Sequence, residues 1–419
     1  MLLPVPPGAG PIARPGLAVS IAARQANPAE ARGREWLTAA IMAQRARVWY
    51  TGFPGPLTPV CGAPASAASG KPYDNQGSWD EGKTMTQKVF ISGIAGFLGS
   101  HLADRFSDRG WRVCGIDNLA GGSARNVPAG ADFLVADCCD RGSYAHLLSG
   151  ADLVYHCACA AYDGLSIFAP SFVFKNTAQA TVDLATATIS AGAGRFVHCS
   201  SMARYGALTP PFTEDMQPEP VTPYGLAKHT SELMIKNLFR THGGEYAIAV
   251  PHSIIGPRQR YSDPYRNVAA IMINRMLRGK QPIIYGDGGQ LRGFSFVGDV
   301  LACLERVGTE PAAEGEVINI GPDEETTSVL QLAEEIAGIM SFQLDPIFVP
   351  ARPLEVKHAT CSADKARKLL GYQTSTSLRD ALTRMIGWMA VQEPMEFSYD
   401  AEIEIPSART PQTWVDRLI

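Results

Sequence analysis

The sequence lacks the features that mark several large classes of protein. No apolar run reaches 18 residues, so no membrane-spanning helix is predicted. Charge is low and balanced, with 37 Lys and Arg against 41 Asp and Glu and a net charge of -4. The basic residues form no long stripe, and a polyanion needs a basic field to bind. We therefore expect neither a membrane nor a nucleic acid as a partner.

Cysteine is too sparse for a disulfide framework. Nine cysteines are scattered over 419 residues, most of them inside apolar runs, where a thiol behaves as a small buried hydrophobic group. This usage is typical of a reduced compartment, and we expect a cytoplasmic protein. The stretch "HCAC" (His156 to Cys159) resembles a metal clip, but it extends an apolar strand and no second ligand pair follows at zinc-like spacing. We predict no metal site.

The first 84 residues have little sustained periodicity and are rich in Ala, Pro, Gly and Arg. We expect most of this extension to be disordered. A cleaved targeting segment, a flexible extension and a start site placed too early are three competing explanations. We favour a start at Met85, because the stretch "MTQKVFISG" leads at once into the first predicted strand.

From residue 86 onward, short apolar runs alternate with helical stretches. The strand candidates are "KVFISG", "RVCGID", "DFLVAD", "DLVYHC", "RFVHCS" and "YAIAVP". This alternation predicts an α/β fold in which helices cover both faces of a doubly wound parallel sheet, as in the Rossmann fold. Residues near 257–295 and 324–395 mix short helices, prolines and turns, which predicts a smaller mixed α/β lobe.

A glycine-rich turn follows the first predicted strand. Gly93, Gly96 and Gly99 stand three apart, and such glycines let the backbone approach a pyrophosphate at a helix N-terminus. Alone, the motif fits a flexible turn equally well. The next strand ends in Asp117, eighteen residues after Gly99, where a carboxylate can accept hydrogen bonds from an adenosine ribose. Because the same carboxylate would repel a 2'-phosphate, the pattern favours NAD over NADP.

A tyrosine and a lysine share one face of a predicted helix that begins at Pro223. Tyr224 and Lys228 are four residues apart. Chance produces this spacing on many helices, but "RFVHCSSMARYG" places a Ser-Ser turn at the carboxyl edge of the sheet, where ligands of doubly wound folds bind. We expect Lys228 and a bound oxidised nicotinamide to lower the tyrosine pKa from about 10 toward the working pH.

Residues from about 86 to 390 resemble the extended short-chain dehydrogenase/reductase family, and within it the nucleotide-sugar epimerases and dehydratases, most of all the UDP-glucose 4-epimerases. The resemblance is carried by "GIAGFLGSHL", "GIDN", "YHCACAA", Asn176 in "FKNTAQAT", "SSMARYG", "TPYGLAK", "IIGPRQ", "YGDGGQLRGFSFVGDV", "VINIGP" and "ARPLEV". These motifs occur in the family's order and at family-like spacing.

The resemblance implies a role for each matching residue. Ser201, Tyr224 and Lys228 correspond to the catalytic hydroxyl, the acid/base and the lysine that orients the ribose. Cofactor contacts are implied for Gly93, Gly96, Phe97, Leu98, Gly99, Asp117, Asn118 and Asp137, although Asp137 reads equally well as a solvated loop carboxylate. Arg292 and Arg352 would bind the substrate's diphosphate, which suits a planar guanidinium. Glu355 would contact the nucleotide-side ribose. Arg258 could face a sugar carboxylate, a phosphate or a structural partner.

The residues after Ser201 bear on the reaction. In the 4,6-dehydratases an Asp-Glu pair follows the catalytic hydroxyl residue, and the UDP-glucuronate decarboxylases have a Glu in the second of those places. Here Met202 and Ala203 occupy them, and neither can transfer a proton. The resemblance therefore implies an NAD-dependent C4 epimerase of UDP-sugars. A decarboxylase or dehydratase is the alternative, and an inactive NAD-binding scaffold is a third.

The resemblance also implies the organisation of the chain. We expect an NAD-binding domain over 86–256 with a returning segment near 294–321, a nucleotide-sugar-binding lobe over 257–395, and a C-terminal tail over 396–419. Relatives usually dimerise through the two helices that carry Asn176 and the tyrosine, and the stretches 172–192 and 224–240 are apolar enough for a homodimer.

Overall fold

The protein is described by a computed structural model, which covers residues 86–419. The expectations for residues 1–84 and for a start at Met85 lie outside these residues. Seven parallel strands form the main sheet in the order β11-β6-β5-β4-β1-β2-β3. Their bounds are β1 (Lys88–Ser92), β2 (Arg112–Asp117), β3 (Asp132–Val135), β4 (Leu153–His156), β5 (Arg195–Cys199), β6 (Tyr246–Pro251) and β11 (Val317–Ile320). The six predicted strands are confirmed as β1 to β6.

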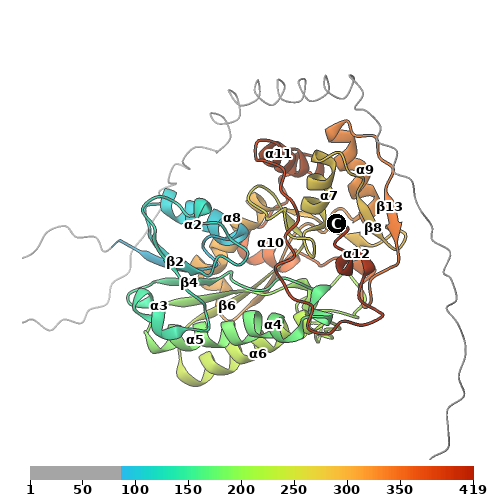
Figure 1. Ribbon diagram of the computed structural model, residues 1–419. Coiled ribbons are helices and arrows are strands. Elements are labelled where there is room, and N and C mark those ends of the chain that lie inside the picture. Colours follow the sequence, from blue (N-terminus) through green and yellow to red (C-terminus); the bar gives the residue numbers. More distant parts are fainter. Residues whose placement is uncertain (1–85) are drawn as a thin grey trace, which may run out of the picture. The chain divides into compact units, whose positions relative to one another are not determined.

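Helices cover both faces of this sheet (Figure 1). Alternate residues of β1 point to opposite sides, so that Val89 and Ile91 join one apolar cluster and Phe90 joins another. The first cluster is closed by α2 (Phe97–Asp108), α8 (Val297–Thr309) and α10 (Asp364–Leu370). The second is closed by α3 (Arg141–Leu148), α5 (Ala180–Ser190) and α6 (Pro223–His242). The doubly wound prediction is therefore confirmed.

The order of the strands reverses between β1 and β4. Chain connections on the two sides of this point leave in opposite directions, which opens a crevice beyond the carboxyl ends of the strands. The short helix α4 (Pro170–Phe174) continues through a π-helical turn (Lys175–Gln179) into α5 and flanks the crevice. Single 3-10 turns occur at Ala124–Asn126, Leu165–Ile167, Met202–Arg204 and Pro311–Ala313.

A smaller lobe lies at one end of the sheet (Figure 1). Its apolar core joins three helices, α7 (Val268–Leu277), α9 (Val329–Met340) and α11 (Leu378–Ala390). Its strands are only two or three residues long: β7 (Ile254–Ile255) with β10 (Ser295–Phe296), β8 (Ile283–Tyr285) with β13 (Ile347–Val349), and β9 (Leu291–Arg292) with β12 (Thr327–Ser328) and β14 (His358–Ala359). Between β10 and β12 the chain returns through α8 to β11 at the edge of the main sheet.

The last residues, 396–419, pack onto the molecule and include α12 (Gln412–Val415). Trp414 and Ile419 are buried in an apolar cluster that also contains Tyr224. The carboxylate of Glu404 accepts hydrogen bonds of 2.8 Å from the backbone amides of Ser171 and Phe172 at the start of α4. The C-terminal tail therefore braces the helix that flanks the crevice.

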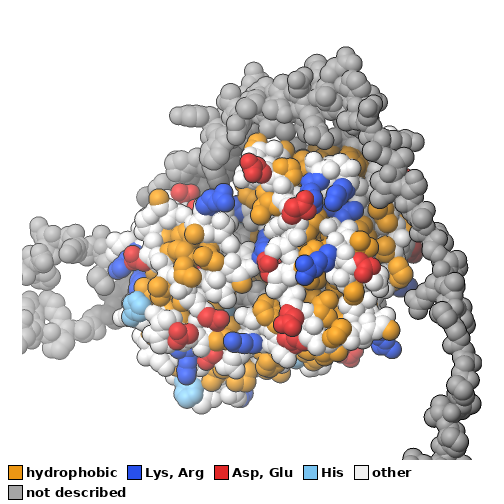
Figure 2. Space-filling model, in the orientation of Figure 1, with side chains coloured by type: hydrophobic (Ala, Val, Ile, Leu, Met, Phe, Trp, Pro, Cys, Tyr) orange, Lys and Arg blue, Asp and Glu red, His pale blue; other side chains and the backbone are white. Residues whose placement is uncertain are grey.

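The surface carries charges of both signs. On the face shown in Figure 2, the Lys and Arg side chains of the described residues are interspersed with Asp and Glu. None of the helices within residues 86–419 combines the length and the apolar character that a membrane crossing needs.

Candidate active site

One cleft of about 1160 Å³ lies at the carboxyl edge of the sheet, between the sheet and the smaller lobe. This volume exceeds the range of about 300–1,000 Å³ that is usual for a single small ligand. The predicted site residues that line it are Gly93, Gly96, Phe97, Leu98, Gly99, Asp117, Asn118, Asp137, Ser201, Tyr224, Arg258, Arg292, Arg352 and Glu355. Lys228 is 2% exposed and lies behind the wall of the cleft.

The glycine loop between β1 and α2 packs backbone against backbone. Gly93 has φ +75°, and a Cβ there would lie 2.8 Å from the amide nitrogen of Ala158. A Cβ on Gly99, in the first turn of α2, would lie 2.1 Å from the carbonyl oxygen of Gly93. Gly96 caps the helix without a side chain. The loop therefore presents the amides of a helix N-terminus to the cleft, with no side chain in the way, which fits a diphosphate.

Asp117 ends β2 beside this loop. Its carboxylate accepts hydrogen bonds from the amides of Ala95 (3.1 Å) and Leu119 (2.8 Å). Burial raises the pKa of Asp117, while these amides act to lower it. Asn118 and Asp137 line the same end of the cleft, and each accepts a hydrogen bond from the amide two residues on, Ala120 (3.1 Å) and Cys139 (2.8 Å). A carboxylate with spare acceptor sites at this position fits a ribose diol.

The Ser-Ser turn after β5 is held by a buried ion pair. Ser200 donates a hydrogen bond of 2.5 Å to Glu232 of α6, whose carboxylate also pairs with Arg204 at 2.9 Å. Both charged side chains are almost fully buried. The hydroxyl of Ser201 accepts a hydrogen bond of 3.2 Å from the amide of Ala203. This network fixes the path of the turn and places Ser201 in the cleft.

Helix α6 begins with Thr222 as its N-cap, since the threonine hydroxyl accepts a hydrogen bond of 3.1 Å from the amide of Gly225. Pro223 occupies the first helical position, as predicted. Tyr224 and Lys228 follow on one face, with the lysine nitrogen 6.0 Å from the centre of the phenol ring. That nitrogen donates a hydrogen bond of 2.7 Å to the carbonyl of Cys199 at the end of β5.

The expected lowering of the tyrosine pKa includes the charge of a bound nicotinamide, and the chain by itself has the opposite effect. Burial raises the pKa of Tyr224 well above its usual value, and the nearby groups of Cys159 and Asp163 raise it further. A hydrogen bond with Ser201 acts to lower it.

Three predicted substrate residues lie near one another in the smaller lobe. Arg352 pairs with Glu355 at 2.5 Å, and its guanidinium lies 4.9 Å from the centre of the Tyr285 ring. Arg292, on β9, donates hydrogen bonds to the carbonyls of Leu291 and Val356, both at 2.7 Å. Burial lowers the pKa of Arg292, and the charge of Glu355 acts to raise it. The two arginines are therefore fixed in orientation at the edge of the cleft.

Arg258 has a structural partner. It forms an ion pair of 2.6 Å with Asp104 on α2, and it adopts a positive φ of +66°. The neighbouring Pro257 carbonyl lies 2.9 Å from the Nε2 of His101, also on α2. Of the three roles considered for Arg258, the structure provides the structural one, because these contacts tie the loop of the smaller lobe to α2.

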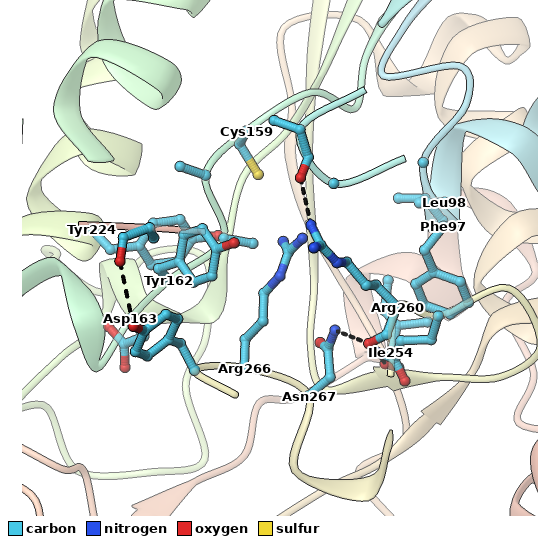
Figure 3. Close-up of a pocket in the computed structure, with 18 of the residues that line it drawn as sticks. Phe97, Leu98, Cys159, Tyr162, Asp163, Tyr224, Ile254, Arg260, Arg266 and Asn267 are labelled. Atoms are coloured by element: carbon cyan, nitrogen blue, oxygen red, sulfur yellow. Dashed lines mark hydrogen bonds between the residues drawn. The ribbon is translucent and has the colours of Figure 1, made fainter. Parts of the chain in front are cut away.

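Several cleft residues escaped the sequence analysis. Arg260 donates to the carbonyl of Ala120 (2.5 Å) and pairs with Asp400 (2.6 Å). Arg266 pairs with Asp263 (3.0 Å) and lies 4.7 Å from the centre of the Tyr162 ring. Figure 3 shows both arginine side chains pointing into the same part of the cleft. They stand in an irregular loop, where neither spacing nor periodicity signals a site.

Asp163 is another such residue. It lines the cleft, and one of its carboxylate oxygens accepts a hydrogen bond of 2.6 Å from the hydroxyl of Thr222. Burial raises the pKa of Asp163, whereas this hydrogen bond and the charges of Arg352 and Arg292 lower it. Figure 3 places Asp163 on the same side of the cleft as Tyr224 and Tyr162.

Comparison with known proteins gives the family. A model described as the NAD dependent epimerase/dehydratase family matches residues 89–321. The UDP-glucose 4-epimerase of Mycolicibacterium smegmatis is 30% identical over 309 residues, which are 71% of this chain and 97% of the relative. UDP-glucuronic acid decarboxylase 2 of Arabidopsis thaliana is 29% identical over 309 residues, 71% of this chain and 67% of the relative.

Solved structures agree with this placement. The UDP-glucose 4-epimerase of Thermotoga maritima, determined with UDP-glucose, matches with a TM-score of 0.69 and 28% identity, covering 72% of this chain and 98% of that one. Epimerases and decarboxylases thus resemble the chain at similar sequence identity, so the comparisons identify the family that both belong to. The chain belongs to the NAD-dependent epimerase/dehydratase family, within the nucleotide-sugar epimerase group of the extended short-chain dehydrogenases/reductases, and its cofactor is NAD.

Proposed function

We propose that the protein inverts a nucleotide sugar at C4 through a transient 4-keto sugar, with UDP-glucose and UDP-galactose as the substrate pair. The observation that carries this proposal is the pairing of an intact Ser201, Tyr224 and Lys228 with Met202 and Ala203 in the two following positions. A 4-keto sugar that meets no further acid or base can turn over in the cleft and be reduced on its other face.

The cofactor would be held at the sheet side of the cleft. We assign the diphosphate to the turn formed by Gly93, Gly96, Phe97, Leu98 and Gly99, the adenosine ribose to Asp117 and Asn118, and the adenine edge to Asp137. Bound there, oxidised NAD would supply the acceptor for the C4 hydride and a positive charge beside the phenol. Because the chain's own groups keep the Tyr224 pKa high, we assign to that charge the lowering of the pKa expected for catalysis.

The chain's residues would then act on the sugar directly. Tyr224 takes the proton of the C4 hydroxyl and later returns it, and the Ser201 hydroxyl holds the C4 oxygen by a hydrogen bond. Lys228 positions the tyrosine indirectly, because its hydrogen bond to the Cys199 carbonyl fixes α6 against the end of β5. Arg292 and Arg352 bind the substrate diphosphate, and Glu355 fixes Arg352 while offering an acceptor to the adjacent ribose.

A second candidate is a decarboxylase or dehydratase. Asp163 favours it, because its carboxyl group faces the same cleft as Tyr224 and its charge affects the tyrosine pKa. A carboxyl group near the 4-keto sugar could exchange protons at a neighbouring carbon. The relatives with decarboxylase activity point the same way.

Product analysis separates these candidates. Purified protein is incubated with UDP-glucose, UDP-galactose, their N-acetyl forms and UDP-glucuronate, and products are separated by chromatography and weighed by mass spectrometry. Inversion at C4 without a change of mass supports the proposal. Loss of water or carbon dioxide supports the second candidate. No turnover of any nucleotide sugar would leave the third candidate, an inactive NAD-binding scaffold.

We also propose a homodimer formed through α6 and the continuous helix that runs from α4 through Asn176 into α5. Phe174, Leu226 and Leu233 are large apolar side chains on these helices, and about half of each is exposed. Leu226 and Leu233 are seven residues apart, so they lie on one face of α6. A second copy of the chain would bury this face in a four-helix interface.

A further inference from the structure

Asp163 is anchored to the catalytic end of α6. One oxygen of its carboxylate accepts the 2.6 Å hydrogen bond from Thr222, the N-cap residue two positions before Tyr224. Ser166 donates to the Asp163 carbonyl at 2.6 Å and accepts a hydrogen bond from the Tyr224 amide at 3.1 Å. The carboxylate therefore cannot shift without disturbing the start of the tyrosine-bearing helix.

The same residue borders the arginines assigned to the diphosphate. A Cβ on the adjacent Gly164 would lie 3.4 Å from a guanidinium nitrogen of Arg352. The charges of Arg352 and Arg292 act on the Asp163 carboxyl group. Asp163 thus lies between the catalytic tyrosine and the arginines, and its second carboxylate oxygen remains able to accept hydrogen bonds from a ligand in the cleft.

In a nucleotide sugar, the hexose connects the diphosphate to the carbon that reacts. Its place in this cleft is therefore the stretch between Arg352 and Tyr224, where Asp163 stands. Resting on the proposed function, we propose that Asp163 accepts a hydrogen bond from a sugar hydroxyl and selects neutral hexoses over uronates. A sugar carboxylate would meet a like charge there, while a hydroxyl would gain a charge-assisted hydrogen bond.

Arg260 and Arg266, which point into the same part of the cleft, do not offset this selection. Arg260 is paired with Asp400, and Arg266 is paired with Asp263. Each positive charge therefore already has a carboxylate partner of its own. A uronate would have to displace one of these partners, whereas a neutral hexose displaces none.

Binding measurements test the proposal without relying on turnover. Calorimetry gives the Kd of UDP, UDP-glucose and UDP-glucuronate for the NAD-loaded wild type, for Asp163→Asn and for the control Asp215→Asn. Asparagine can still accept the hydrogen bond of Thr222, so the variant keeps the local structure while losing the charge. Asp215 is exposed and does not line the cleft, which makes it a matched Asp-to-Asn control.

We expect wild type to bind UDP-glucose at least about 10-fold more tightly than UDP-glucuronate. Asp163→Asn should raise the Kd for UDP-glucose about 10-fold and change the Kd for UDP by less than about 3-fold, so that the variant binds UDP-glucose and UDP-glucuronate with similar affinity. Asp215→Asn should have the Kd values of wild type. Unchanged sugar preference in Asp163→Asn overturns the inference while leaving the proposed function standing. If wild type binds none of these ligands, the proposed function and the inference both fail.

Discussion

The ammonium nitrogen of Lys228 lies 2.7 Å from the carbonyl oxygen of Cys199 and donates a hydrogen bond to it. This bond joins the second turn of the tyrosine-bearing helix to the end of β5, immediately before the Ser-Ser turn. Lys228 is buried, so it supports the proposed catalytic groups from behind the cleft wall. The relative positions of Ser201 and Tyr224 thus depend on a lysine that does not line the cleft.

Removal of the phenol hydroxyl should stop the reaction without disturbing the cofactor. For Tyr224→Phe we expect kcat for C4 inversion to fall by about 10²–10⁴-fold, because the proton acceptor is lost. NAD released from the denatured protein and quantified by chromatography should remain at the wild-type ratio. Tyr246→Phe, at the opposite end of its strand from the cleft, is the control and should keep full activity. Unchanged kcat in Tyr224→Phe would remove the assigned base.

Two helical glycines should respond to alanine in opposite ways. In Gly99→Ala the new Cβ would lie 2.1 Å from the carbonyl of Gly93, so the turn must open, and we expect lower stability and much weaker NAD binding. In Gly338→Ala of α9 no atom lies within 4 Å of the new Cβ, so stability should rise by up to about 1 kcal/mol. Thermal unfolding and NAD titration of both variants test this contrast. Equal effects would contradict it.

The ion pair beneath the Ser-Ser turn should matter more than an exposed one. Glu232→Gln leaves the buried charge of Arg204 without a counter-charge, and we expect the free energy of unfolding to fall by about 3–5 kcal/mol. Glu335→Gln breaks the exposed pair with Arg379 and should cost at most about 1 kcal/mol. Urea unfolding measures both. Similar losses in the two variants would show that the buried pair has no special role.

A buried histidine should make stability depend on pH. Burial lowers the pKa of His156 to about 3. Its Nδ1 lies 2.6 Å from the Ser92 hydroxyl and its Nε2 lies 3.0 Å from the Thr181 hydroxyl. Because Thr181 donates its own hydrogen to the Thr177 carbonyl, Nε2 carries the imidazole proton and Nδ1 accepts from Ser92. The folded protein therefore holds this histidine neutral.

As the pH falls below about 6.5, His156 binds a proton in the unfolded chain, whereas in the folded protein it stays neutral down to about pH 3. Stability is thus full above pH 6.5 and declines in acid, by up to about 1.4 kcal/mol per pH unit for one histidine. In His156→Gln the slope of the unfolding free energy between pH 4 and 6 should be shallower by that amount. His242→Gln, at an exposed site, should keep the wild-type slope.

The proposed dimer can be broken at one residue. In Leu233→Arg a charge would enter the apolar face of α4 and α6, and we expect sedimentation velocity to show a monomer where wild type sediments as a dimer. Val391→Arg, a similarly exposed apolar position beyond α11, should leave the dimer intact. A dimeric Leu233→Arg variant would place the interface elsewhere.

The main sheet was predictable because it repeats one local pattern. Each apolar run of four to six residues became a strand, and the helix at Pro223 begins where the proline signal places it. The strands of the smaller lobe could not be predicted in this way, since strands of two or three residues are too short to show an alternating apolar pattern. The mixture of short helices, prolines and turns predicts this lobe but not the bounds of its strands.

The site was predictable where chemistry is local in sequence. The glycine loop, Asp117 and the Tyr224–Lys228 pair stand at fixed spacings. The structure brings the loop, Asp117 and Tyr224 to one cleft, and Lys228 lies behind its wall. The sequence could not show that Lys228 is buried, that burial raises the tyrosine pKa, or that Arg258 meets Asp104. Each of these depends on contacts between segments far apart in the chain, as does the place of Asp163.

The position of Ile419 has a practical consequence. Its side chain lines the cleft, its amide donates a 3.1 Å hydrogen bond to the hydroxyl of Tyr399, and the preceding carbonyl accepts a 3.0 Å hydrogen bond from Arg275. A purification handle fused after this residue would emerge beside the cavity and could occupy it.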